Sequence, residues 1–165
     1  MLPLLKRLSE ILSQELAQYS KLLELLSIKR YALVGNSAEQ IYEILKQQET
    51  LILALKALEE ARVVVMNKLA QRFQISAQKL TLLDLASRVE EPFASAYKEL
   101  SQQFAELLLQ LEQANRDNAY LIDRSLDYIN SSLRLFAAAD VLGAGYFDSK
   151  TLKPQSKGKH VCQTA

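Results

Sequence analysis

The scarcity of glycine and proline constrains the fold of this chain more than any other feature. Between Leu4 and Leu142 the sequence contains one glycine, Gly35, and one proline, Pro92. Folds with β-sheets need many tight turns, and glycine and proline supply most of them. The 165 residues suffice for one domain with a substantial core, and 49% of them are hydrophobic. The sequence therefore predicts an all-α fold, and it has too few glycines for a phosphate-binding loop.

Two long helices are predicted from apolar residues that recur at alternating spacings of three and four. The first runs from about Leu4 to Val34 and the second from about Ala38 to Phe73. Between them, Gly35 is expected to form a left-handed C-cap, and Ser37 with Gln40 has the spacing of a capping box. A link this short makes the second helix fold back antiparallel on the first.

The stripe of the second helix is interrupted by Gln48 and Arg62, which we interpret as register or snorkelling positions. Thr81 with Asp84 then indicates the start of a short helix that runs through about Val89.

A last long helix follows, with Pro92 in its first turn and an apolar stripe that continues to Phe136 across a polar gap at residues 115–118. No apolar period follows Leu142, so residues 1–142 are predicted to form the helical domain and residues 143–165 a disordered basic tail. The predicted architecture is an elongated antiparallel helical hairpin, or a three- to four-helix coiled-coil-like bundle.

The charge distribution excludes several classes of function. Residues 1–148 carry 16 basic and 19 acidic side chains, while residues 149–165 add four lysines and no acid. A mildly acidic body argues against a nucleic-acid surface. The chain lacks an apolar run of the roughly 20 residues that span a bilayer and a secretory signal, and its single cysteine, Cys162, fits a reducing compartment. We therefore expect a cytoplasmic protein with no integral membrane segment.

The sequence offers little chemistry for catalysis. The one histidine, His160, lies in the tail beside Cys162, and no Glu-x-x-His motif or zinc ligand set is present. Paired acids such as Glu59-Glu60 are interpreted as solvated helix faces. We expect no catalytic residue, no metal and no cofactor.

The last helix carries an unusual face in which amides mix with apolar residues. Asparagine is a poor residue for a helix interior, so two of them three residues apart need a reason. Either they make hydrogen bonds between helices that set the register, or they belong to a recognition face for a partner helix, and the residues alone favour neither. The face consists of Asn115, Asn118, Leu121, Ile122, Ser125, Leu126, Ile129, Asn130 and Leu133.

This face resembles the late-helix signature of the FlgN family of flagellar export chaperones, from Asn115-x-x-Asn118 through Leu121-Ile122 and Ser125-Leu126 to Tyr128-Ile129. The resemblance covers nearly all of residues 5–148. It includes residues 12–23, 29–33, 49–52, 58–62 and 80–82, in the order in which the family has them.

The resemblance implies a non-enzymatic, cytoplasmic chaperone of flagellar type III export. Family members hold the hook–filament junction proteins FlgK and FlgL and deliver them to the cytoplasmic domain of the export gate protein FlhA. It also implies that the nine-residue face binds the exported protein and that Tyr146 contacts the gate. Here Phe147 is inserted after that tyrosine, and a glycine soon after the acid is missing.

Two other classes of function remain open at this point. One is a structural coiled-coil module that associates with itself and has no export cargo. The other is a membrane-surface protein that uses the basic tail.

Overall fold

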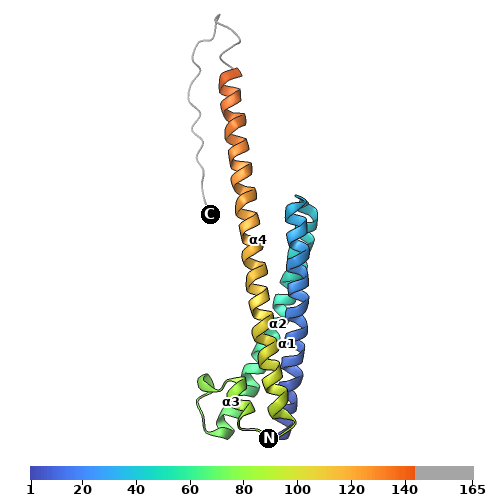
Figure 1. The fold of residues 1–165 in the computed structure, drawn as a ribbon, viewed down its shortest axis with the longest axis vertical. Helices are drawn as coiled ribbons and strands as arrows, with labels where there is room; N and C mark the ends of the chain where they lie inside the picture. The colour runs from blue at the N-terminus through green and yellow to red at the C-terminus, as the bar shows by residue number, and fades with distance from the viewer. Residues whose placement is uncertain (144–165) are drawn as a thin grey trace, which may run out of the picture. The chain divides into compact units, whose positions relative to one another are not determined.

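The computed structural model describes residues 1–143, which are almost entirely helical (Figure 1). In chain order the elements are α1 (Leu2–Val34), α2 (Ala38–Phe73), the 3-10 turn η1 (Ala77–Lys79), α3 (Leu82–Ala86) and α4 (Phe93–Gly143). No strand occurs in these described residues, and the all-α prediction is confirmed.

The chain divides into two compact units. The first spans Met1–Arg124, and the second begins at Ser125 within α4. The first unit contains α1, α2, α3 and the opening part of α4. The predicted boundary between residues 142 and 143 stays a prediction.

Helices α1 and α2 form the antiparallel hairpin that the sequence predicts, and they lie side by side (Figure 1). Their 33 and 36 residues make rods of about 50 Å and 54 Å at 1.5 Å per residue. The buried side chains of each helix follow the predicted stripe. They are Leu5, Leu8, Ile11, Leu12, Glu15, Leu26, Ala32 and Leu33 in α1, and Ile44, Gln48, Leu55, Val65, Leu69 and Ala70 in α2.

The turn between α1 and α2 corrects the prediction for Gly35. Gly35 has a right-handed conformation with φ −79°, and the left-handed residue is Asn36 with φ 51°. The N–H of Asn36 donates to the Leu33 carbonyl, and the N–H of Ser37 donates to the Ala32 carbonyl. This is the Schellman pattern, whose left-handed position asparagine tolerates better than most residues.

The same turn corrects the capping box predicted for Ser37 and Gln40. Ser37 is the N-cap of α2, but its hydroxyl makes no capping hydrogen bond. In a capping box the third helical residue accepts from the N–H of the cap residue. Here that N–H already donates to the Ala32 carbonyl at 3.0 Å, so the motif lacks its second donor.

The helix start predicted at Thr81 with Asp84 is confirmed, and the two residues form a capping box. The Asp84 N–H donates to the Thr81 hydroxyl oxygen at 3.1 Å, and the Thr81 N–H donates to the Asp84 carboxylate at 3.1 Å. The Thr81 hydroxyl also donates to the Asp84 carboxylate at 2.6 Å, and this bond, together with the one from the Thr81 N–H, holds the pKa of Asp84 below its usual value. The helix that follows is shorter than predicted and ends at Ala86, and the Arg88 N–H then donates to the Leu85 carbonyl in a tight turn.

The core of the first unit is concentrated where η1 and α3 cover the hairpin. Its fully enclosed members are Leu8, Ile11, Leu12, Leu69, Leu85 and Tyr97, which come from α1, α2, α3 and α4. This cluster fixes the start of α4.

Pro92 stands just before the first helical residue of α4 rather than in its first turn, where the sequence predicted it. The Glu91 carboxylate accepts hydrogen bonds from the Ser95 N–H and hydroxyl.

Candidate partner-binding site

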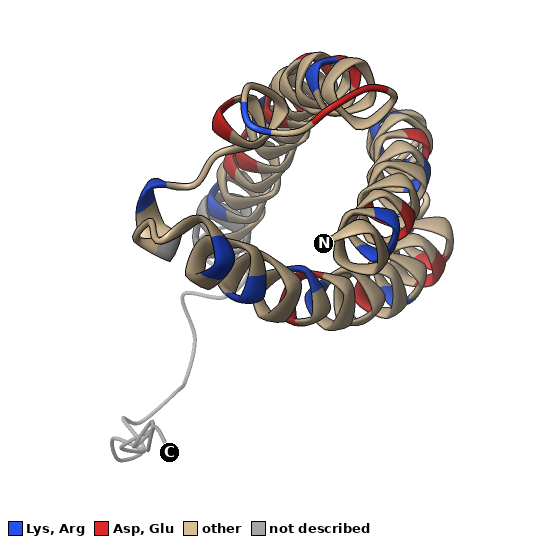
Figure 2. Ribbon diagram, turned by 90° about the horizontal axis from the view of Figure 1, so that it is seen from below, with Lys and Arg blue, Asp and Glu red and all other residues tan. Residues whose placement is uncertain are grey.

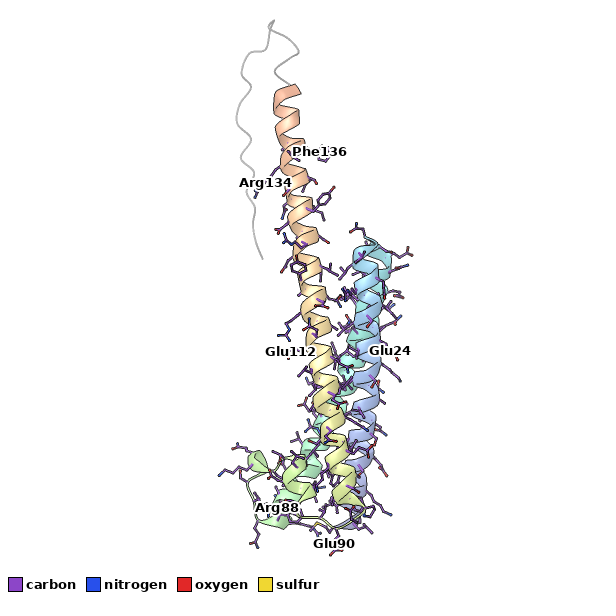
Figure 3. All side chains as sticks on the ribbon, viewed as in Figure 1. Glu24, Arg88, Glu90, Glu112, Arg134 and Phe136 are labelled. Carbon is purple, nitrogen blue, oxygen red and sulfur yellow. The ribbon has the colours of Figure 1, made fainter. Side chains whose placement is uncertain are left out.

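Beyond residue 125, α4 exposes a row of large apolar side chains. Four side chains at spacings of three and four leave more than half of their surface in water, and they are Leu126 (53%), Ile129 (51%), Leu133 (60%) and Phe136 (70%). Figure 3 shows the Phe136 side chain standing out from the helix. We call these four residues the apolar stripe. A contiguous apolar surface of this kind on a helix is typical of a docking site for a partner.

The nine residues of the predicted face occupy three different environments. Asn118 is buried, and Leu121, Ile122 and Ser125 are half-buried. Asn115, Leu126, Ile129, Asn130 and Leu133 are exposed. The face therefore does not act as one surface in the free protein, and only its later part is open to a partner. Tyr146 lies outside the described residues.

Asn118 makes a hydrogen bond between helices, which is one of the two roles that the sequence left open for the asparagines. Its side-chain N–H donates to the Leu26 carbonyl of α1 at 2.9 Å, and only 2% of the residue is exposed. The amide oxygen Oδ1 is buried without a hydrogen-bond partner. An unpaired buried acceptor costs about 1–3 kcal/mol, so this site is not optimised for stability alone.

A second hydrogen bond from α4 to the α1 backbone sets the same register. The Tyr97 hydroxyl donates to the Leu5 carbonyl at 2.8 Å, and Tyr97 is fully buried. Tyr97 and Leu5 are 92 residues apart, as are Asn118 and Leu26. The two bonds therefore lie 21 residues apart on each helix, so α1 and residues 93–124 of α4 run parallel in a heptad register.

The heptad register separates two faces of the α4 sequence. Tyr97, Phe104, Leu111 and Asn118 follow one another at intervals of seven and are buried or half-buried. The apolar stripe occupies other heptad positions. Leu126 and Leu133 each lie one residue beyond the continuation of this packed seam, and Ile129 and Phe136 each lie four residues beyond it. From the sequence alone we predicted one continuous stripe that included both the packed seam and the apolar stripe. The two faces can be told apart only once the register of α4 against α1 is known.

Arg62 and Glu15 form an ion pair between α2 and α1. The Arg62 Nε–H donates to Glu15 Oε1 at 3.0 Å, and Glu59 lies near the same guanidinium. Glu15 is buried, and this burial raises its pKa above the ordinary value against the opposing hydrogen bond and charge of Arg62. Desolvation also raises the pKa of Tyr19, and the Glu15 charge adds to this effect. Of the two roles interpreted for Arg62 from the sequence, a register or a snorkelling position, this ion pair with Glu15 favours the first.

A groove of about 640 Å³ lies between α1 and α4 in the first unit. Its α1 wall comes from residues 26–34 and its α4 wall from residues 110–118. We call it the α1–α4 groove, and it is lined by Leu26, Ser27, Arg30, Tyr31, Val34, Gln110, Gln113, Ala114, Asp117 and Asn118. The sequence did not indicate it, because its two walls are more than 75 residues apart in the chain.

The described surface has no patch of a single charge that would favour an anionic or a cationic ligand. Lysines and arginines alternate with aspartates and glutamates along the helices (Figure 2). Within residues 1–143 no three His, Cys, Asp or Glu side chains lie close enough together to hold a metal ion. No helix in the same part of the chain has the length and apolar character needed to cross a bilayer.

Comparison with known protein families gave a match. The model of the family described as FlgN protein matches residues 1–154. Searches of characterised proteins and of solved structures gave no significant match.

Proposed function

Because the chain belongs to the FlgN family of flagellar export chaperones, we propose that it binds the hook–filament junction proteins FlgK and FlgL and delivers them to the export gate protein FlhA. FlgN is a chaperone family, and its members act in general in the cytoplasm. The proposal takes this chain to be a cytoplasmic chaperone without enzymatic activity.

The observation that carries the proposal is the exposed apolar stripe of α4. Covering half of an exposed leucine, isoleucine or phenylalanine side chain contributes about 0.75–1.5 kcal/mol. The four stripe residues together offer about 3–6 kcal/mol to a partner that covers them. An amphipathic helix fits such a stripe, because its own apolar side chains recur at the same three- and four-residue spacing.

A co-purification experiment tests cargo binding. Tagged chaperone is mixed with purified FlgK or FlgL, and the Leu126→Asp and Ile129→Asp variants are compared with the wild type. Both variants should lose the junction protein, because each places a charge in the covered stripe. Helicity and melting temperature should stay within the wild-type range, since both positions are exposed.

The matched control is Leu109→Asp, which introduces the same charge at a leucine of α4 that is 69% exposed and outside the stripe. This variant should retain both junction proteins. If Leu126→Asp and Ile129→Asp unfold the protein, the stripe belongs to the core and the assignment is wrong. If they fold and still bind as the wild type does, the cargo lies elsewhere.

Docking to the gate is proposed for residues 144–165, with Tyr146 as the anchor. The proposal rests on the family pattern and on the adjacent aromatic residues Tyr146 and Phe147 in an otherwise polar tail. Deletion of residues 144–165 should weaken binding to the FlhA cytoplasmic domain while sparing the junction proteins. Tyr146→Ala should reproduce much of this loss in a calorimetric titration, and an unchanged affinity for the gate would refute the role of Tyr146.

A further inference from the structure

The α1–α4 groove has the features of a binding surface rather than of an imperfectly packed seam. Its α1 wall presents two large apolar side chains to water, since Tyr31 is 78% and Val34 is 67% exposed. Leu26 and Ala114 form apolar surface deeper in the groove. The core cluster of the first unit lies where η1 and α3 cover the hairpin, and it includes none of the groove residues.

The charged groups of the groove satisfy one another. One oxygen of Asp117 lies 3.4 Å from the Arg30 guanidinium, and its other oxygen accepts from the Gln113 side-chain amide at 2.8 Å. The groove therefore presents no unpaired charge. By charge complementarity it fits an uncharged face of a partner and disfavours a face that carries lysine or glutamate, whose desolvation it could not offset.

One polar group at the groove lacks a partner. Asn118 lines the groove, and its Oδ1 is buried without a hydrogen bond. The terminal torsion of an asparagine side chain is broad, so the amide can turn to meet an incoming group, at the cost of about 1 kcal/mol for its hydrogen bond to the Leu26 carbonyl. A neutral donor such as serine, threonine, asparagine or glutamine on the partner would satisfy this oxygen.

We propose that the α1–α4 groove is a second contact for the exported protein, in which Tyr31 and Val34 of α1 cover the uncharged face of a cargo helix that carries one neutral hydrogen-bond donor. This inference rests on the proposed function and extends it, because it assigns part of the cargo surface to α1. The α1 wall spans nine residues, about 13 Å, which matches between two and three turns of a bound helix.

The chain offers a matched pair of tyrosines for the test. Tyr31 lines the groove, whereas Tyr42 of α2 is 70% exposed and does not. Tyr31→Asp and Val34→Asp should each weaken the affinity for FlgK or FlgL at least about tenfold in calorimetric titration, as expected for an interface anchor. Tyr42→Asp should bind as the wild type does. All three variants should keep the wild-type melting temperature, because the positions are exposed.

The outcomes separate this inference from the proposed function. If the wild type binds and Leu126→Asp does not, while Tyr31→Asp and Val34→Asp bind normally, the groove is not a cargo contact and the proposed function stands. If the wild type binds neither junction protein, both proposals fail. If the wild type alone is a dimer that Tyr31→Asp converts to a monomer, a second copy occupies the groove and the inference is overturned.

Discussion

Replacement of Asn118 by leucine should make the free protein more stable while impairing its binding. Asn118 donates one hydrogen bond, to the Leu26 carbonyl, and leaves Oδ1 buried and unpaired. The lost hydrogen bond costs about 1 kcal/mol, whereas removal of the unpaired acceptor returns about 1–3 kcal/mol. The buried leucine adds hydrophobic stabilisation of similar size, partly offset where its shape fits less well. We expect the free energy of unfolding to rise by about 1–2 kcal/mol, which corresponds to roughly 2–8 °C in melting temperature.

Urea unfolding monitored by circular dichroism measures this change, with Asn115→Leu as the control. Asn115 is exposed and three residues away in α4, so its replacement gains only the better helix propensity of leucine, about 0.5 kcal/mol. Asn118→Leu should exceed that gain and should weaken binding of the junction proteins. If Asn118→Leu is instead less stable than Asn115→Leu by more than about 1 kcal/mol, our assessment of the buried amide is wrong.

Three further changes test the packing of the first unit. Leu8→Ala should lower the free energy of unfolding by about 2–5 kcal/mol in urea titration, because Leu8 is fully buried in the core. Thr81→Ala should cost about 1 kcal/mol, since it removes the capping box with Asp84, and Thr81→Ser should restore most of it. Burial raises the pKa of Glu15 above 4.5, so the folded state binds this proton more tightly than the unfolded state. The stability of the wild type relative to Glu15→Gln should therefore fall as pH rises from 4 to 7, and a relative gain over this range would contradict the assignment.

Much of the fold could be predicted from the sequence because its elements are long and periodic. The start and end of α2 match the predicted residues, and the end of α1 does as well. The turn between them was harder, since two adjacent residues, Gly35 and Asn36, can both adopt a left-handed conformation. The choice depends on which carbonyl of α1 the following N–H reaches, and this is a property of the closed turn.

The candidate site was predicted only in part, because it depends on how α4 lies against α1. The spacing of Asn115 and Asn118 is the same whether an asparagine faces solvent or another helix. Once the register places Asn118 opposite Leu26, one amide is buried and the other exposed. The α1–α4 groove has no sequence signal at all, since Tyr31 and Ala114 become neighbours of one cavity only in the folded unit.

Hydrogen exchange of α4 with and without bound FlgK or FlgL tests the central claim most directly. Residues 122–136 include the four side chains of the apolar stripe, which a bound helix would cover. We predict that these amides exchange several-fold more slowly in the complex, while the amides of α2 around Leu53, an exposed leucine outside both proposed contacts, keep their rates. Unchanged exchange across residues 122–136 in a complex shown to be fully formed would contradict the claim that this part of α4 holds the exported protein.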